Sequence, residues 1–244
     1  MKSHTIKLAI IGDFDPSSES HQATNEAIGH AAGPAGITGA YDWIATDTIH
    51  KRFNEIIQTY TSFWIAPGSP YRSMSGVLDI IQYARTHKLP ILGTCGGFQH
   101  MAIEYARHVL HIEDAQHAEY DPYASALVVT PLSCNLKGAP LEISITAADS
   151  QVARIYGTAS ITEQYYCNFG LNPAYQEQLH RNGLRIVGSD TTQEARILEL
   201  QDHPFFIATL FVPQHQSTPE TPNRLITAFL EAAAKAEAEK NPLS

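Results

Sequence analysis

A cysteine at the junction of an expected strand and an expected helix restricts the fold more than any other feature. Residues 91–99 read ILGTCGGFQ, with glycines close on both sides of Cys95. A residue on such a tight strand-to-helix turn tends to be strained, and flanking glycines give it room. Its side chain would project at the carboxyl edge of a sheet, where α/β proteins bind ligands. The following helix N-terminus favours negative charge, so we expect a lowered pKa for the Cys95 thiol.

The pattern has two interpretations. In the first, Cys95 is a nucleophile, and the backbone N–H groups that follow it form half of an oxyanion hole. In the second, Cys95 is a structural cysteine beside a glycine turn that binds phosphate. The motif alone does not separate the two.

Strands and helices are expected to alternate through the first half of the chain. The continuous apolarity of Ile6 to Ile11 indicates a strand covered on both faces. Further strands are expected at 41–45, 63–65 and 91–92, with helices at 18–32, 52–60, 75–87 and along the segment from Phe98 to Val109. This order predicts a doubly wound α/β fold, with a mostly parallel sheet and helices on both faces.

The second half is expected to be richer in strands. A helix opens at Asn172-Pro173 and closes at Gly183, which is the usual placement of proline and glycine. Strands are expected at 184–187, 196–200 and 206–211, and a last helix near residue 221. The sequence has no internal repeat, linker or low-complexity tract, so one domain is predicted over residues 1–244.

Charge and hydropathy exclude two classes of partner. The net charge is −9 and the basic residues are scattered, so no basic stripe is available for nucleic acid. The longest apolar run, Phe205 to Val212, is too short to cross a membrane. The N-terminal apolar stretch stops at Gly12, as a strand does, so no signal peptide is expected.

The cysteines indicate the compartment. Cys95, Cys134 and Cys167 are odd in number and widely spaced. This spacing predicts neither a disulfide framework nor a zinc site, and it indicates a cytoplasmic location. We therefore expect no metal, no cofactor and no disulfide framework. Cys134 is expected to be structural.

From Trp64 to Tyr120 the sequence resembles the glutaminase half of CTP synthase, a class I glutamine amidotransferase. The stretch IAPGSPYRSMSGVLDIIQYARTHKLPILGTCGGFQHMAIEYARHVL is similar to that family's oxyanion loop, its next helix, its cysteine elbow and the helix after it. The similarity resumes at NPAYQEQLHRNGLRIVG and at LELQDHPFFIATLFVPQHQS. It extends to a group of short proteins related to the C-terminal region of CTP synthase.

The resemblance implies a flavodoxin-like fold and a role in pyrimidine metabolism. In this family, the elbow cysteine attacks the amide of glutamine, forms a thioester and releases ammonia. By position, Cys95 would be the nucleophile, and the N–H groups of Gly68 and Gly96 would form the oxyanion hole. Gln99 and Glu119 would hold the amino-acid end of the substrate. The resemblance implies no cofactor.

Three positions depart from the family pattern. The family's base and its orienting acid lie in a Phe-His-Pro-Glu motif, where this chain has Val212 and Gln214. Val212 cannot accept a proton, and Gln214 cannot stabilise an imidazolium. The arginine that resembles a clamp for the α-carboxylate is replaced by Asn168. Loss of that bidentate pair is expected to weaken glutamine binding.

Another histidine could act as the base in place of the one that the family has. His117 is the candidate, because it lies two residues before Glu119 in a segment expected to be irregular or extended; the alternative is a surface histidine. His215 is expected to face away, since residues 212 and 214 of an extended segment share the opposite side. His100 is one helical step of about 100° from Gln99 and should also point elsewhere.

Tyr166 and Cys167 lie beside Asn168 in the sequence. They could line the same pocket, but core packing is the expected role of both.

Three functions remain open. The first is a Cys95-dependent hydrolase or amidotransferase acting on a small amide-like molecule. The second is a non-catalytic binding or regulatory protein that uses the old glutamine pocket. The third is a glutaminase subunit that supplies ammonia to a separate synthetase. The sequence has no phosphate-binding loop, so a complete CTP synthase is not expected. The partner alternatives are a separate synthetase chain and a second copy of this chain.

Overall fold

The computed structural model describes residues 4–132, 138 and 140–240, and its centre is a sheet of nine strands. Their order is β2-β1-β3-β4-β12-β11-β10-β7-β8. Five strands pair in parallel: β2 (Ile37–Ile44), β1 (His4–Ile11), β3 (Ser62–Ile65), β4 (Ile91–Thr94) and β12 (Phe206–Thr209). Four continue the sheet with antiparallel pairing: β11 (Ala195–Leu200), β10 (Leu184–Ser189), β7 (Pro140–Ile145) and β8 (Ser160–Gln164).

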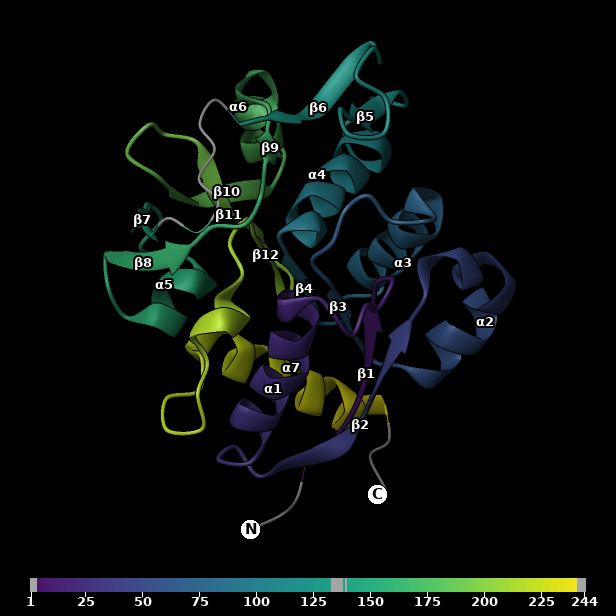
Figure 1. The fold of residues 1–244 in the computed structure, drawn as a ribbon, viewed down its shortest axis with the longest axis vertical. Helices are drawn as coiled ribbons and strands as arrows, with labels where there is room; N and C mark the ends of the chain where they lie inside the picture. The colour runs from purple at the N-terminus through teal and green to yellow at the C-terminus, as the bar shows by residue number, and fades with distance from the viewer. Residues whose placement is uncertain (1–3, 133–137, 139, 241–244) are drawn as a thin grey trace.

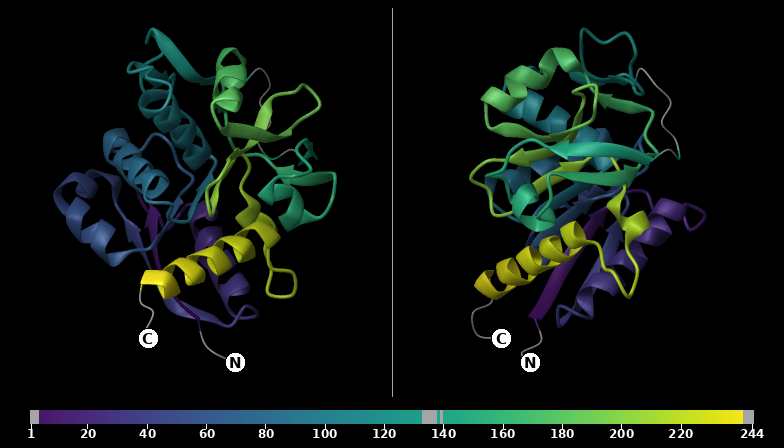
Figure 2. Two further views of the ribbon diagram at one scale, coloured as in Figure 1. Left: turned by 180° about the vertical axis from the view of Figure 1, so that it is seen from behind. Right: turned by 90° about the vertical axis from the view of Figure 1, so that its left-hand side faces the viewer.

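Two layers of helices cover the sheet (Figures 1 and 2). The first contains α1 (Glu19–Ala32), α5 (Gln151–Tyr156) and α7 (Arg224–Lys240), and α7 contacts both others. The second contains α2 (Ile49–Thr59), α3 (Met74–Thr86), α4 (Gly96–His108) and α6 (Pro173–Arg181). Two 3-10 helices, η1 (Thr46–Thr48) and η2 (Pro213–Gln216), follow β2 and β12.

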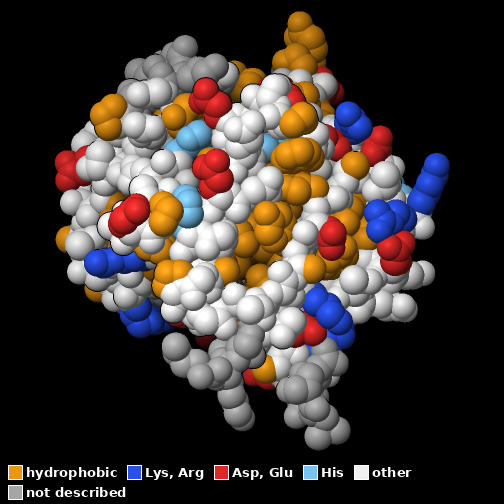
Figure 3. All heavy atoms as spheres, turned by 60° about the horizontal axis from the view of Figure 1, so that its bottom comes forward, with side chains coloured by type: hydrophobic (Ala, Val, Ile, Leu, Met, Phe, Trp, Pro, Cys, Tyr) orange, Lys and Arg blue, Asp and Glu red, His pale blue; other side chains and the backbone are white. Residues whose placement is uncertain are grey.

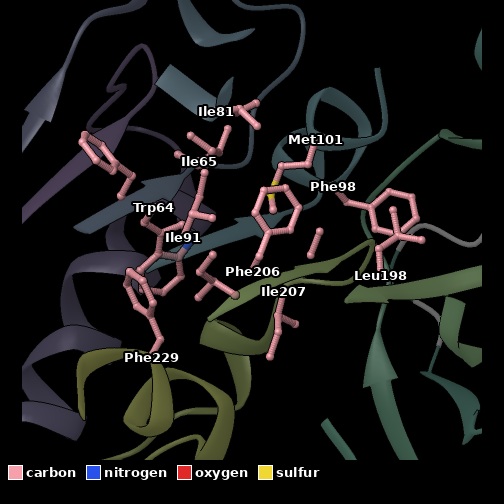
Figure 4. Close-up of a cluster of buried hydrophobic side chains, with 14 of the residues drawn as sticks. Trp64, Ile65, Ile81, Ile91, Phe98, Met101, Leu198, Phe206, Ile207 and Phe229 are labelled. Carbon is pink, nitrogen blue, oxygen red and sulfur yellow. The ribbon is translucent and has the colours of Figure 1, made fainter. Parts of the chain in front are cut away.

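Side chains of strand β3 pack against helices of both layers. All four of its residues are buried, so successive side chains must pack on opposite sides. Trp64 packs edge-to-face on Phe229 of α7, with ring centroids 5.9 Å apart. Ile65 lies under Gly97 of α4 instead. Figure 4 shows these side chains in the core between α4 and α7. Two-sided burial was predicted for Ile6 to Ile11, and it is confirmed in β1, where residues 8–11 are all fully buried.

A second, three-stranded sheet lies against α4. It consists of β5 (Ala115–His117), β6 (Ala126–Pro131) and β9 (Phe169–Leu171). These strands are short, and together with β7, α5 and β8 they were not predicted from the sequence. The expected α/β fold with a β-rich second half is confirmed. Cys134 lies outside the described residues.

A hollow with a volume of about 910 Å³ lies between α1, α5 and α7. Its lining is mainly apolar and includes Ile155, Phe205 and Ala228. Figure 3 shows the face around α7, across which hydrophobic side chains form a band. This hollow shares no lining residue with the cavity at Cys95. None of the described helices is both long enough and apolar enough to span a membrane.

Candidate functional site

A cavity of about 280 Å³ collects most of the predicted site residues. Its lining consists of Ser18, Ser20, Pro67, Gly68, Ser69, Cys95, Gln99, Glu119, Tyr166, Cys167, Asn168, Phe169 and Val212. The cavity lies where β4 and β12 end, at the carboxyl edge of the parallel strands, as predicted for an α/β ligand site. Gly96, His117 and Gln214 are outside this lining.

Cys95 occupies the predicted strained turn. Strand β4 ends at Thr94 and α4 begins at Gly96, which leaves Cys95 alone with φ 52° and ψ −104°. This backbone conformation is rare for a residue with a side chain, and such strain concentrates at functional sites. A hydrogen bond from the Cys95 N–H to the Thr209 carbonyl oxygen, 2.9 Å long, fixes the turn to β12.

The glycine after the turn permits the close approach of α4 to the sheet. A Cβ atom on Gly97 would lie 2.2 Å from the Ile65 carbonyl oxygen, and that oxygen belongs to the backbone and cannot swing away. Only glycine therefore allows the helix N-terminus to sit this close behind Cys95.

The loop that carries Gly68 is held in place by a buried histidine. His21 Nδ1 accepts a hydrogen bond from the Asp15 N–H, at 3.0 Å, so the neutral ring carries its hydrogen on Nε2. That Nε2 lies 3.0 Å from the Pro67 carbonyl oxygen and donates to it. The Pro67–Gly68 peptide is trans, so the Gly68 N–H points away from His21. Gly68 itself has φ +105°, which favours glycine.

Gly96 brings a second N–H group next to this loop. As the first residue of α4, it has no acceptor for its N–H within the helix. A Cβ atom on Gly96 would lie 3.1 Å from the Ser69 nitrogen, so the elbow and the loop are in close contact. This arrangement is compatible with two N–H donors acting on one oxygen atom.

His100 lies beneath the elbow rather than in the cavity, as predicted. Its Nδ1 lies 2.7 Å from the Gly96 carbonyl oxygen, and its Nε2 lies 3.0 Å from the Tyr120 hydroxyl. The same hydroxyl accepts the Tyr71 N–H at 2.6 Å. Burial lowers the pKa of His100 to about 4, so the ring is neutral at physiological pH. It links the elbow to the loop after Gly68.

His117 is completely buried, and both of its ring nitrogens are engaged. Its Nδ1 accepts the Glu119 N–H at 3.0 Å, so the neutral ring donates from Nε2 to Gln99 Oε1, also at 3.0 Å. Burial lowers the pKa of His117 to about 3. A neutral imidazole whose one lone pair is already in use is poorly suited to take a proton from Cys95. The geometry instead makes His117 a support for Gln99 and Glu119.

Gln99 is held at both ends of its amide. Its Oε1 also accepts from the Ser69 hydroxyl at 3.3 Å, and its Nε2 donates to the Phe169 carbonyl oxygen at 2.9 Å. The side chain therefore joins the loop that carries Gly68 and Ser69 to β9.

Glu119 brings an unsatisfied acceptor to the cavity. Its Oε2 atom is buried and has no hydrogen-bond partner among the described residues. A buried carboxylate oxygen without a partner is costly, and a bound cation or N–H donor would satisfy it. The site therefore favours a ligand with an ammonium group.

The two positions to which the resemblance assigns a base and its orienting acid diverge in space. Val212 is buried in the cavity wall, whereas Gln214 points toward α1 and donates from Nε2 to Thr24 Oγ1 at 3.1 Å. Neither side chain can carry a proton. Asn168 is exposed and lines the cavity, and its side chain carries no charge.

His215 does not line the cavity, as predicted, but it lies at the cavity's edge. That prediction assumed an extended segment, but residues 213–216 form the 3-10 helix η2. The His215 ring stacks on Tyr166 with centroids 4.7 Å apart, and its Nε2 lies 2.9 Å from Ser20 Oγ. Both Tyr166 and Ser20 line the cavity. Tyr166 therefore belongs to the site rather than to the core.

The partner of His215 distinguishes it from His21 and His117. A hydroxyl can donate to neutral imidazole and accept from imidazolium, so the contact with Ser20 survives a change of protonation. The contacts of His21 and His117 include a backbone N–H donor to Nδ1, which protonation would break. Burial lowers the pKa of His215, which is half-buried.

A disulfide is present, although the cysteine count had indicated no disulfide framework. Cys95 Sγ is bonded to Cys167 Sγ, with Cα atoms 6.1 Å apart and a sequence separation of 72. Cys167 is only 3% exposed, and its Sγ lies 3.0 Å from the Leu210 carbonyl oxygen. Cys167 thus lines the site as well as packing into the core. Its position next to Asn168 was the one sequence signal for this.

The described residues contain no cluster of three or more His, Cys, Asp or Glu side chains that could hold a metal ion. The site is built from a cysteine pair, backbone N–H groups, one carboxylate and one histidine at its edge.

Comparison with known proteins gives consistent results. A family described as "Glutamine amidotransferase class-I" matches residues 21–232. CTP synthase of Saccharolobus solfataricus is 30% identical over 241 residues, which is 94% of this chain and 45% of that protein. CTP synthase of Coprothermobacter proteolyticus is 28% identical over 95% of this chain and 46% of that protein. The chain thus spans less than half the length of these relatives.

Solved structures agree on the fold. The glutaminase domain of Trypanosoma brucei CTPS with bound acivicin superposes with a TM-score of 0.88 and 22% identity, over 94% of each chain. A glutamine amidotransferase from Thermotoga maritima gives a TM-score of 0.55 and 12% identity, over 98% of this chain and 86% of that one.

Proposed function

We propose that this chain, which belongs to the class I glutamine amidotransferase family, is a Cys95-dependent hydrolase or amidotransferase for a small amide that carries an ammonium group. The observation that supports this most is the shared cavity: a strained cysteine at a helix N-terminus, the Gly68 loop and the unsatisfied Glu119 oxygen all border the same space. The proposal applies to the reduced protein, because a sulfur atom in a disulfide cannot attack an amide.

Each step of the proposed reaction has a residue to support it. The Cys95 thiolate attacks the amide carbon, and the N–H groups of Gly68 and Gly96 donate to the oxygen that becomes negative. The amine leaves with a proton, and water then hydrolyses the thioester. Glu119 would bind the substrate's ammonium group, and Gln99 would hold the loop and β9 around it.

Proton transfer is assigned to His215 rather than His117. His215 reaches the cavity through the Ser20 hydroxyl, and this contact persists in both protonation states. His117 is assigned a positioning role, because its Nε2–H fixes Gln99 Oε1 and its Nδ1 fixes the Glu119 N–H. A base acting through a hydroxyl is expected to be less effective than one in direct contact with the thiol.

The replacement of the arginine clamp points to the kind of substrate. Asn168 offers a neutral amide where a carboxylate would need a cation. We therefore propose that the substrate has an ammonium group but no α-carboxylate. Supply of ammonia to a separate synthetase in the cytoplasm remains part of this proposal as one use of the product.

One alternative has support from a specific observation. Val212 seals the wall with an apolar side chain, and Gln214 is hydrogen-bonded away from the cavity. These features suit a binding or regulatory protein that retains the pocket without turnover. Such a protein would be stabilised by an ammonium-bearing amide, and replacement of Cys95 would not affect that stabilisation.

Ammonia release distinguishes the two proposals. Fully reduced protein and its Cys95→Ala variant are compared on glutamine and on γ-aminobutyramide, which is glutamine without its α-carboxylate. We expect Cys95-dependent release that is faster from γ-aminobutyramide. The His215→Gln variant should lower this rate, whereas His50→Gln, on the exposed surface of α2, should not. Thermal stabilisation by γ-aminobutyramide without any release would favour the binding protein.

A further inference from the structure

We propose that Cys95 and Cys167 form a reversible dithiol–disulfide couple that reduces small disulfides carrying an ammonium group. The two cysteines are bonded to each other and both border the cavity. This activity goes beyond the amide chemistry proposed above and does not depend on it. A disulfide in a cytoplasmic protein is usually transient and belongs to catalysis or redox sensing.

The two sulfur atoms have different surroundings, which assigns their roles. Cys95 is partly exposed to the cavity at the N-terminus of α4, where the helix dipole favours a thiolate. Cys167 is 3% exposed, and the Leu210 carbonyl oxygen lies 3.0 Å from its Sγ. In the reduced protein that carbonyl accepts the thiol hydrogen and keeps Cys167 protonated. Cys95 is therefore the attacking cysteine and Cys167 the resolving cysteine.

The proposed reaction has two exchange steps. The Cys95 thiolate attacks one sulfur of the substrate disulfide, a mixed disulfide forms at Cys95, and the first substrate thiolate leaves. Cys167 then attacks Cys95 Sγ, and its proton passes to the second substrate thiolate as that group leaves. Two electrons and the protons of two thiols move to the substrate, which becomes two thiols. The protein is left with the Cys95–Cys167 bond, and an external dithiol must reduce it to restore the starting state.

This chemistry does not need the residues that the chain has lost. Thiol–disulfide exchange requires a thiolate and a second cysteine in reach. It requires neither a base at position 212 nor a carboxylate at position 214. The same substitutions that weaken amide hydrolysis therefore leave the exchange reaction intact.

Glu119 defines the substrate class. Its buried Oε2 has no partner among the described residues, so an ammonium group of the substrate would complete the site. Asn168 provides no counter-charge for a carboxylate. These two residues favour cystamine, a disulfide with two ammonium groups and no carboxylate, over the uncharged hydroxyethyl disulfide.

Single-turnover experiments on the full chain test the proposal. All proteins carry Cys134→Ser, so that only the pair can react, and they are reduced and freed of reductant. At pH 6, where an ordinary thiol with a pKa of about 8.5 is almost fully protonated, cystamine should oxidise the protein and form the Cys95–Cys167 bond, as read by peptide mass. The same chain unfolded in urea should react far more slowly.

Variants separate the two cysteines and the substrate contact. Cys167→Ser should accumulate a stable mixed disulfide at Cys95, and Cys95→Ser should not react. Glu119→Gln should slow the reaction with cystamine roughly tenfold, as expected for a lost charge-assisted hydrogen bond. The rate of its reaction with hydroxyethyl disulfide should change by less than about twofold.

Three results would overturn the proposal. The folded protein could react with cystamine no faster than the unfolded chain, or oxidation could leave no Cys95–Cys167 bond. The third is that the folded protein reacts equally fast with cystamine and with hydroxyethyl disulfide. Loss of the amide activity has a different signature. It is measured as ammonia release from γ-aminobutyramide by the fully reduced protein, which requires no Cys95–Cys167 bond.

Discussion

Replacing Glu163 with glutamine is expected to stabilise the protein at neutral pH but much less at pH 5. Glu163 lies on β8 and is 2% exposed, and its Oε2 has no hydrogen-bond partner among the described residues. Burial raises the pKa of this carboxyl group from 4.5 to about 8. In the folded protein the group therefore stays protonated at pH 7, whereas in the unfolded chain it is ionised.

The size of the effect follows from this difference in pKa. A raised carboxyl pKa lowers the free energy of unfolding as pH rises through the unfolded pKa, until the folded pKa is reached. One pKa unit corresponds to about 1.36 kcal/mol, so the cost is about 3 kcal/mol at pH 7 and about 1 kcal/mol at pH 5. Glutamine resembles the protonated acid in shape and has no charge to lose. The variant should avoid this cost at both pH values.

Urea unfolding at pH 5, 6, 7 and 8 measures the difference, with wild type and variant handled in the same redox state. The gain of Glu163→Gln over wild type should grow by about 2 kcal/mol between pH 5 and pH 7. Glu142→Gln serves as the control, because Glu142 is exposed and lies opposite Thr162 on the neighbouring strand. A gain that is the same at every pH, or the same pH dependence in the control, would refute the reasoning.

Two further predictions concern the elbow and the lost base. Gly97→Ala should lower the free energy of unfolding by roughly 3 kcal/mol or more, because its Cβ would meet the Ile65 carbonyl oxygen at 2.2 Å. Gly29→Ala is the control, because a Cβ atom at Gly29 would meet nothing within 4 Å. It should raise the free energy of unfolding by up to about 1 kcal/mol in the same urea titration. Val212→His together with Gln214→Glu should raise Cys95-dependent ammonia release by roughly tenfold or more, whereas Gln214→Glu alone should not. An unchanged rate in the double variant would mean that the missing base does not limit the reaction.

The parts of the site that the sequence predicted are those with local signals. The elbow could be identified because glycines and a strand-to-helix transition lie within nine residues of one another, at 91–99. Gly68, Gln99 and Glu119 were placed by resemblance to a family, and all three line the cavity around Cys95. The buried strands β3, β4 and β12 were predictable because their apolarity is continuous.

The parts that were missed depend on tertiary contacts or on an assumed periodicity. Nothing in the local sequence pairs Cys95 with Cys167 across 72 residues, and a count of cysteines argued against it. The contacts of His215 at the cavity's edge were not predicted, because its segment was taken as extended, whereas Pro213 begins a 3-10 helix there. Ser20 could not be connected to His215 across 195 residues. Short strands such as β5 and β9 have too few residues to show a period.

The central claim is that Cys95 is an activated nucleophile once the bond to Cys167 is reduced. Its most direct test is the rate of Cys95 alkylation by iodoacetamide between pH 5 and pH 9, read by intact mass, before and after reduction. After reduction we expect a midpoint well below the ordinary thiol pKa of about 8.5, with no alkylation of Cys95 before reduction and none in Cys95→Ala. A glutamine-derived electrophile should be slower than its counterpart without the α-carboxylate. A Cys95 that is reduced but stays unreactive across this range, or reacts with the midpoint of an ordinary thiol, would contradict the claim.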